Sequence, residues 1–158
     1  MIRSVLFTTA TFFFSLGIMN AQVVTPGTGV SWNADSLVEY FSDFIIEYQE
    51  GDIRVFEIAN SNVEISPTDE LILEDVSLRL GDTAQVTANE ATVVFRDVIV
   101  ESATDTIFPR LRFLDSEVDI EDFELRGGSG ISLIDSDFLV QNAYFNGVKY
   151  QSGNPSTA

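Results

Sequence analysis

The chain has 158 residues, of which 25 are acidic and eight basic, and it contains neither cysteine nor histidine, so its formal net charge is −17. This acidity argues against nucleic acid or an anionic membrane as a partner, because binding to either depends on lysine and arginine. The missing residue types exclude Ser-His-Asp and Cys-His nucleophilic systems, ordinary zinc sites and disulfides.

Residues 1–21 have the features of a secretory signal peptide. Arg3 supplies the early positive charge, an apolar run extends from Val5 to Met19, and Ala21 offers a cleavage point. The alternative is a membrane anchor, but the apolar run is shorter than the ~20 residues that a bilayer span requires. We therefore expect a secreted or cell-surface protein without membrane insertion after signal removal. The remaining chain is long enough for one modest domain.

Residues 22–52 are expected to form a lead-in and a capping helix. Apolar side chains recur at helical spacing behind Asn33 and a Ser36-x-x-Glu39 capping box, namely Leu37, Phe41, Phe44, Ile45 and Tyr48. Such a helix would cover the open apolar end of a repeat structure. The alternative is that Trp32 and the neighbouring aromatic residues form a platform for a sugar ring.

Residues 53–158 repeat one pattern of short strands. Two full copies lie twenty residues apart, LRFLDSEVDIEDFEL from Leu111 and ISLIDSDFLVQNAYF from Ile131, and shorter copies begin at Leu71 and Val93. Apolar residues alternate within each copy, as in strands with one buried face, and the alternation breaks at Asp or Asn residues that suit bends. A repeat of 20 to 25 residues is typical of solenoids, so we predict an all-β parallel β-helix. The alternative is a β-sandwich.

Stacking the copies predicts which side chains become neighbours. Two columns alternate in sign, the Arg96 column (Glu74, Arg96, Glu121) and the Arg79 column (Arg79, Glu101, Arg126). A third, which we call the bend column, places like charges one strand spacing apart and consists of Asp75, Asp97, Asp122 and Asn142. We expect the bend column to lie at a solvated corner or to recruit a cation. Asp75, Asp97 and Asp122 are therefore candidate Ca²⁺ ligands.

Three phrases resemble the start of secreted right-handed parallel β-helix proteins of Bacteroidetes, within the pectin-lyase-like group. They are TPGTGVSW from Thr25, the following DSLVEYF, and VEISPTDELILEDVSL from Val63. The resemblance implies a right-handed parallel β-helix, here of about four to five rungs with the N-terminal capping helix. Family members often carry many more rungs and a C-terminal sorting domain. Residues 151–158 read as a loop in mid-repeat, so we expect the N-terminal portion of such a protein, incomplete at its C-terminus.

No catalytic motif of that family matches residue by residue. The candidate ligand-binding residues are Asp97, Asp122, Arg110, Arg112 and the outward-facing Tyr144. Residues 103–106 and 108–110 are expected to bulge from the surface. We expect a non-catalytic extracellular module that binds polysaccharide or serves as a surface or adhesion scaffold. The alternative is the N-terminal part of a polysaccharide lyase or glycoside hydrolase of the pectin-lyase-like fold, acting with Ca²⁺ through a site on later rungs.

Overall fold

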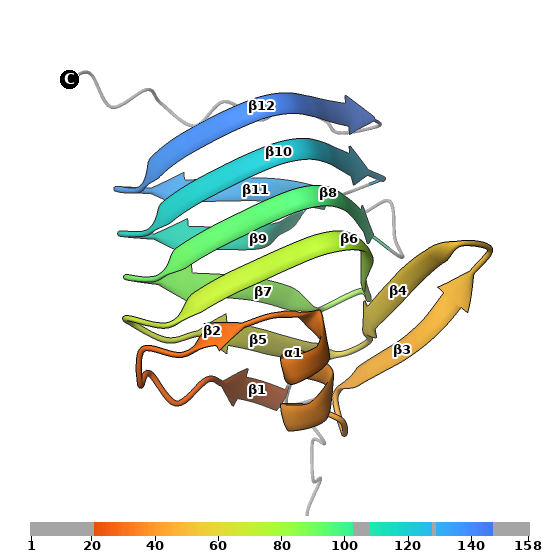
Figure 1. Ribbon diagram of the computed structural model, residues 1–158, viewed down its shortest axis with the longest axis horizontal. Coiled ribbons are helices and arrows are strands. Elements are labelled where there is room, and N and C mark those ends of the chain that lie inside the picture. The colour runs from red at the N-terminus through yellow and green to blue at the C-terminus, as the bar shows by residue number, and fades with distance from the viewer. Residues whose placement is uncertain (1–20, 103–107, 128, 147–158) are drawn as a thin grey trace, which may run out of the picture.

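Two parallel sheets wind around a common core in the computed structural model, which describes residues 21–102, 108–127 and 129–146 (Figure 1). The result is a β-solenoid of about four turns, which confirms the predicted parallel β-helix. The β-sandwich alternative is wrong, because successive copies of the repeat pair in parallel and in register. The candidate signal peptide up to residue 20, residues 103–106 and residues 151–158 lie outside the described part of the chain. No described helix is long and apolar enough to cross a membrane.

The strands divide between two sheets. The five-stranded sheet contains, in spatial order, β1 (Ala21–Val24), β5 (Ser61–Ile65), β7 (Gln85–Asn89), β9 (Phe108–Leu114) and β11 (Ser129–Ile134). The seven-stranded sheet contains β12 (Asp137–Asn146), β10 (Glu117–Arg126), β8 (Thr92–Ser102), β6 (Glu70–Leu80), β4 (Ile53–Ile58) and β3 (Ile45–Glu50), and β2 (Ser31–Trp32) pairs with β6.

The chain turns at residues in the left-handed conformation, and these are the positions where the sequence alternation breaks. The bend column divides the long strands β6, β8, β10 and β12, with φ of 52° at Asp75, 50° at Asp97 and Asp122, and 53° at Asn142. A second set, the corner column, joins the five-stranded to the seven-stranded sheet and consists of Thr68, Glu90, Asp115 and Asp135. Asp and Asn tolerate this conformation better than most residues do, which explains their recurrence at the bends.

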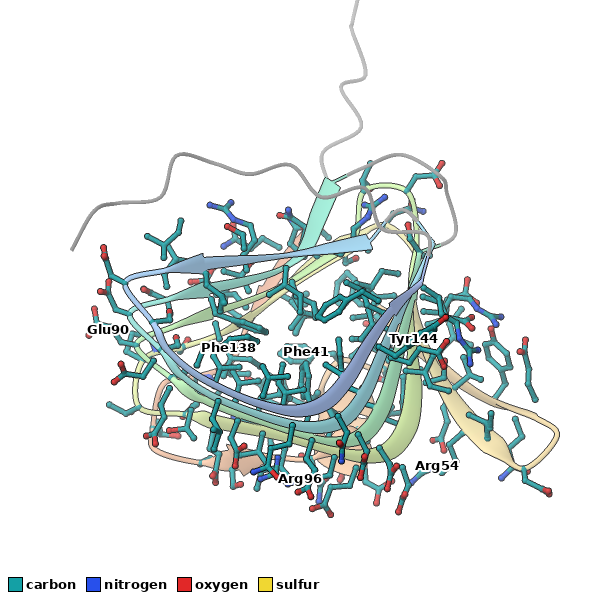
Figure 2. All side chains as sticks on the ribbon, turned by 90° about the horizontal axis from the view of Figure 1, so that it is seen from above. Phe41, Arg54, Glu90, Arg96, Phe138 and Tyr144 are labelled. Carbon is teal, nitrogen blue, oxygen red and sulfur yellow. The ribbon has the colours of Figure 1, made fainter. Side chains whose placement is uncertain are left out.

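The core consists of apolar columns that continue from turn to turn. Leu71, Val93 and Val118 occupy one column in register and are each at most 1% exposed. Phe95 stacks on Phe123 with ring centroids 6.0 Å apart. Figure 2 looks down the coil and shows side chains filling its interior. Burial of these columns drives folding through the hydrophobic effect.

A short helix closes the N-terminal end. Helix α1 (Ala34–Tyr40) begins after Asn33, whose side chain accepts from the amide of Ser36 while the Ser36 hydroxyl accepts from the amide of Asn33. The capping box is therefore formed by these two residues and not by Ser36 and Glu39. Trp32 is buried and packs on Phe41 with ring centroids 6.1 Å apart. The capping role is confirmed, and the sugar-platform alternative is wrong for Trp32 because its ring is covered.

The helix is shorter than predicted. Ile45 and Tyr48 lie in β3, which pairs antiparallel with β4 and forms a hairpin that projects from the coil (Figure 1). The hairpin turns at Gly51, where φ is 65°, a conformation that glycine adopts without strain. The pairing of β4 with β6 places this hairpin at the N-terminal end of the seven-stranded sheet.

Candidate functional site

The Arg79 column forms as predicted and is internally satisfied. Arg79 and Arg126 both pair in register with Glu101, and each approaches a Glu101 carboxylate oxygen to 3.0 Å. Arg126 also contacts Glu124 at 2.6 Å. These side chains are less than half exposed, so their mutual bonds hold the guanidinium groups in place. The column fixes the register of the strands and leaves few donors for a ligand.

The β3–β4 hairpin extends this column in a way that the repeat pattern did not predict. Arg79 contacts both carboxylate oxygens of Glu50, at 2.8 and 3.0 Å, and donates to the Tyr48 hydroxyl at 2.5 Å. These contacts raise the pKa of Arg79, with Glu50 as the main cause. Burial and the hydrogen bond to Glu57 raise the pKa of Tyr48. Arg79 thus links β3 to the coil through side chains, in addition to the backbone pairing of β4 with β6.

The Arg96 column also has the predicted register, with Arg96 between Glu74 and Glu121. Its closest ion pair, however, is with Asp119, and Glu121 lies at 3.4 Å. The Asp119 contact is the main cause of the raised pKa of Arg96. The Asp119 side chain also borders a shallow hollow on the surface. This hollow has a volume of about 330 Å³ and is lined by Glu117, Val118, Asp119, Asp137, Phe138 and Leu139.

The bend column lies at an exposed corner. Asp75, Asp97, Asp122 and Asn142 are all exposed, as expected for a solvated corner. Within residues 21–102, 108–127 and 129–146, no group of three or more acidic side chains is arranged to hold a metal ion. The structure therefore gives no support to Asp75, Asp97 and Asp122 as Ca²⁺ ligands, and that role stays a prediction.

Arg110 does not face a ligand. It is fully buried, and its guanidinium donates to the backbone carbonyls of Asp82 at 2.6 Å and Ala84 at 3.2 Å. Burial lowers the pKa of Arg110. The expected surface bulge at residues 108–110 is wrong, because these residues begin strand β9. The structure also does not bring Arg110 and Arg112 together with Asp97 and Asp122, since the two pairs belong to different sheets.

Tyr144 lies on the surface as predicted, and Arg112 is partly exposed. Arg112 is half-buried and projects from the five-stranded sheet in register between Thr87 and Ser132. Arg54, Arg79, Arg96 and Arg126 all form ion pairs, whereas Arg112 forms none with the described part of the chain. Tyr144 projects from the seven-stranded sheet and is 62% exposed. Among the described basic residues, Arg112 is therefore the best placed to bind an external group.

The most perturbed carboxyl group belongs to Asp69, which sequence reasoning missed. Asp69 is 1% exposed and accepts hydrogen bonds from the amides of Gly27, Gly29 and Val30 and from Trp32 Nε1, at 2.9 to 3.1 Å. Burial opposes ionisation, but these bonds and one from Thr25 lower its pKa to about 2. All its partners are groups of the protein, so Asp69 holds the TPGTGVSW segment and is structural. The TPGTGVSW segment was the sequence feature that could have indicated a buried carboxylate. Its glycines leave neighbouring backbone amides accessible, and such amides require an acceptor.

No protein-family model, curated protein or solved structure matches the chain. The fold thus rests on the strand topology, and the resemblance to the pectin-lyase-like group, carried by the phrases TPGTGVSW, DSLVEYF and VEISPTDELILEDVSL, stays a prediction.

Proposed function

We propose that this chain is secreted by means of its N-terminal signal peptide and acts outside the cell as a non-catalytic β-helix module that binds polysaccharide or serves as a surface scaffold. Residues 1–21, with their early arginine and apolar run, support secretion. The phrases shared with secreted pectin-lyase-like proteins favour the same location. Binding without catalysis is in keeping with a chain that lacks histidine and cysteine throughout.

The observation that carries the binding proposal is the surroundings of Arg112. Arg112 lies in register between Thr87 and Ser132 on the neighbouring strands of the five-stranded sheet, which is parallel throughout. Neighbouring strands are about 4.8 Å apart, so donors and acceptors recur along the sheet at short, regular intervals. Because Arg112 forms no ion pair with residues 21–102, 108–127 and 129–146, its planar set of donors remains available there for hydroxyl or carboxylate oxygens. An extended sugar polymer offers such oxygens repeatedly.

Affinity electrophoresis of the purified full chain in gels containing neutral or acidic polysaccharides tests the proposal. We expect retardation in at least one gel, and we expect Arg112→Ala to lower the affinity at least fivefold. Arg54→Ala is the matched control, because it removes the same charge from a hairpin residue that pairs with Asp35 and Glu47. Migration unaffected by every polysaccharide would refute glycan binding. Release of oligosaccharides would favour the lyase or hydrolase alternative.

A further inference from the structure

The last described turn of the coil exposes side chains that the preceding turn buries. Phe138, Phe145 and Leu133 are in register with Val118, Leu125 and Phe113, and therefore face the interior of the coil. The residues of the preceding turn are at most 1% exposed, whereas Phe138 is 40%, Phe145 51% and Leu133 38% exposed. Figure 2 looks onto this end and shows Phe138 within the outline of the coil. We call this surface, formed by β11 and β12, the open end.

The open end also has a free strand edge. β12 pairs with β10 on one side, and no described strand pairs with its other side. Such an edge presents a row of backbone donors and acceptors that can pair with another strand. Proteins commonly protect edge strands with charged side chains or prolines. β12 has no proline, and Asp137 is its one charged residue.

β12 carries fewer acidic residues than β10, the neighbouring strand of the preceding turn. This difference favours contact between β12 and the same strand of a second copy. β10 carries five acidic residues and one basic residue, and two such strands of an acidic protein would repel each other. In β12 the counterparts of Glu121, Glu124 and Asp122 are Gln141, Tyr144 and Asn142. The strand at the open end has therefore lost the charges that would oppose association.

The opposite end of the coil is closed. Helix α1 covers it, and Trp32, Leu37 and Phe41 are each less than 10% exposed there. The projecting β3–β4 hairpin occupies the same end (Figure 1). In the described part of the chain, the N-terminal end therefore offers no open apolar surface on which the open end of a second copy could stack. The matching surface on a second copy is its own open end.

We propose that two copies of this chain associate through their open ends, with β12 of each pairing antiparallel to β12 of the other about a two-fold axis near Asn142. In this arrangement the interior columns of the two coils form one continuous core. The antiparallel direction places Asp137 of the two copies at opposite ends of the paired strands, so that their charges do not meet. An interface between like surfaces closes on itself and gives a discrete dimer.

The open end contributes apolar surface to such an interface. Leu133, Phe138 and Phe145 face the interior of the coil and are 38% to 51% exposed. At ~200 Å² for each large side chain, these fractions leave roughly 260 Å² per copy, or roughly 500 Å² for two copies. The backbone edges of β12 and the outward side chains beside them, Leu139 and Tyr144, would supply the rest of the ~1,200 Å² that a specific and stable interface buries. This inference is independent of the proposed glycan binding.

Sedimentation equilibrium of the purified full chain provides the first test. We expect a reversible monomer–dimer equilibrium, which Leu139→Lys shifts at least tenfold toward monomer because Leu139 lies on the edge strand and is 55% exposed. Ile46→Lys is the matched control. It changes charge and apolarity in the same way at a residue of β3 that is 58% exposed, and should leave the equilibrium unchanged. A full chain that is monomeric at every concentration, or an equal shift in both variants, refutes the proposal.

Cross-linking identifies the surface independently. The chain has no cysteine, so Asn142→Cys introduces a single thiol close to the proposed axis, where mild oxidation should give a covalent dimer. Asp97→Cys is the control, because it places a thiol at the same exposed bend with nearly the same φ, 50° instead of 53°, two turns from the open end. Efficient cross-linking of Asn142→Cys alone supports the two-fold arrangement. Equal cross-linking of both variants, or of neither, overturns it.

Discussion

Trp32 Nε1 donates a hydrogen bond of 3.1 Å to the Asp69 carboxylate, and this contact joins the cap of the coil to its first corner. The Asp69 backbone carbonyl accepts from the amide of Thr92 on the next turn. One residue thus links the N-terminal segment through its side chain and the repeat through its backbone. Because this carboxylate is buried, its bonds are not in competition with water.

Asp69→Asn should destabilise the protein by about 3 kcal/mol at neutral pH, since an amide nitrogen replaces one of two oxygens that each accept at least two hydrogen bonds. The pKa of Asp69 is lowered from 3.8 to about 2, so ionisation contributes about 2 kcal/mol that is present above pH 4 and is lost as the pH falls toward 2. Urea unfolding at pH 7 and pH 2.5 should therefore show a smaller difference between wild type and Asp69→Asn at the lower pH. Asp43→Asn, at an exposed position, serves as the control. A difference that does not change with pH would contradict the lowered pKa.

The Arg79–Glu101 pair should show measurable coupling. Both side chains are about one quarter exposed, and Arg79 is held on its other side by Glu50 and Tyr48. A double-mutant cycle with Arg79→Ala and Glu101→Ala should give about 1 kcal/mol of interaction, weaker in high salt. The corresponding cycle for Arg54 and Asp35 should give a smaller value, because the Asp35 side chain is 73% exposed. Equal coupling in the two cycles would show that burial does not set the strength of these pairs.

The charge columns were predictable from the sequence for a physical reason. In a coil with parallel, in-register strands, each residue meets its own counterpart one repeat away, so the spacing of the copies defines the neighbours. Arg79, Glu101 and Arg126 meet as predicted. The bends at Asp97 and Asp122 follow from the same periodicity, because a residue that turns the chain breaks the alternation of buried and exposed positions.

Features outside the repeat were not predictable in this way. Ile45 and Tyr48 fit the spacing of a helix in the sequence. They lie in a strand because β3 forms backbone hydrogen bonds with β4, and the apolar spacing carries no information about this pairing. Arginine is seldom fully buried, and Arg110 becomes so because the carbonyls of Asp82 and Ala84 lie within its reach. Tyr144 was placed on the surface correctly, since it lies at an outward position of the alternation.

A β-branched residue at the bend column should be costly. Asp97 has φ of 50°, a backbone conformation in which the Cβ atom of most residues clashes with the neighbouring backbone. Asp97→Val should reduce the free energy of unfolding by about 1 to 2 kcal/mol, whereas Asp97→Asn should change it by less than about 0.5 kcal/mol. Thr92→Val, at a half-buried residue of the same strand without positive φ, is the control for the change to valine. Chemical denaturation gives all three values. If Asp97→Val were as stable as Asp97→Asn, the bend would not depend on the left-handed conformation.

The serine that follows the corner column should stabilise the coil in proportion to its burial. The Ser116 hydroxyl accepts from the amide of Ala91 at 3.3 Å and donates to the carbonyl of Leu114 at 2.7 Å, and Ser116 is 3% exposed. Ser136 makes equivalent bonds one turn later, to the amide of Ser116 and the carbonyl of Ile134, but in a more exposed setting. Ser116→Ala should cost about 1 to 2 kcal/mol, because it leaves the Ala91 amide buried without an acceptor. Ser136→Ala should cost less, since water can replace the lost bond. Urea unfolding and the hydrogen exchange rate of the Ala91 amide measure both effects, and a larger cost for Ser136→Ala would show that burial does not govern this contact.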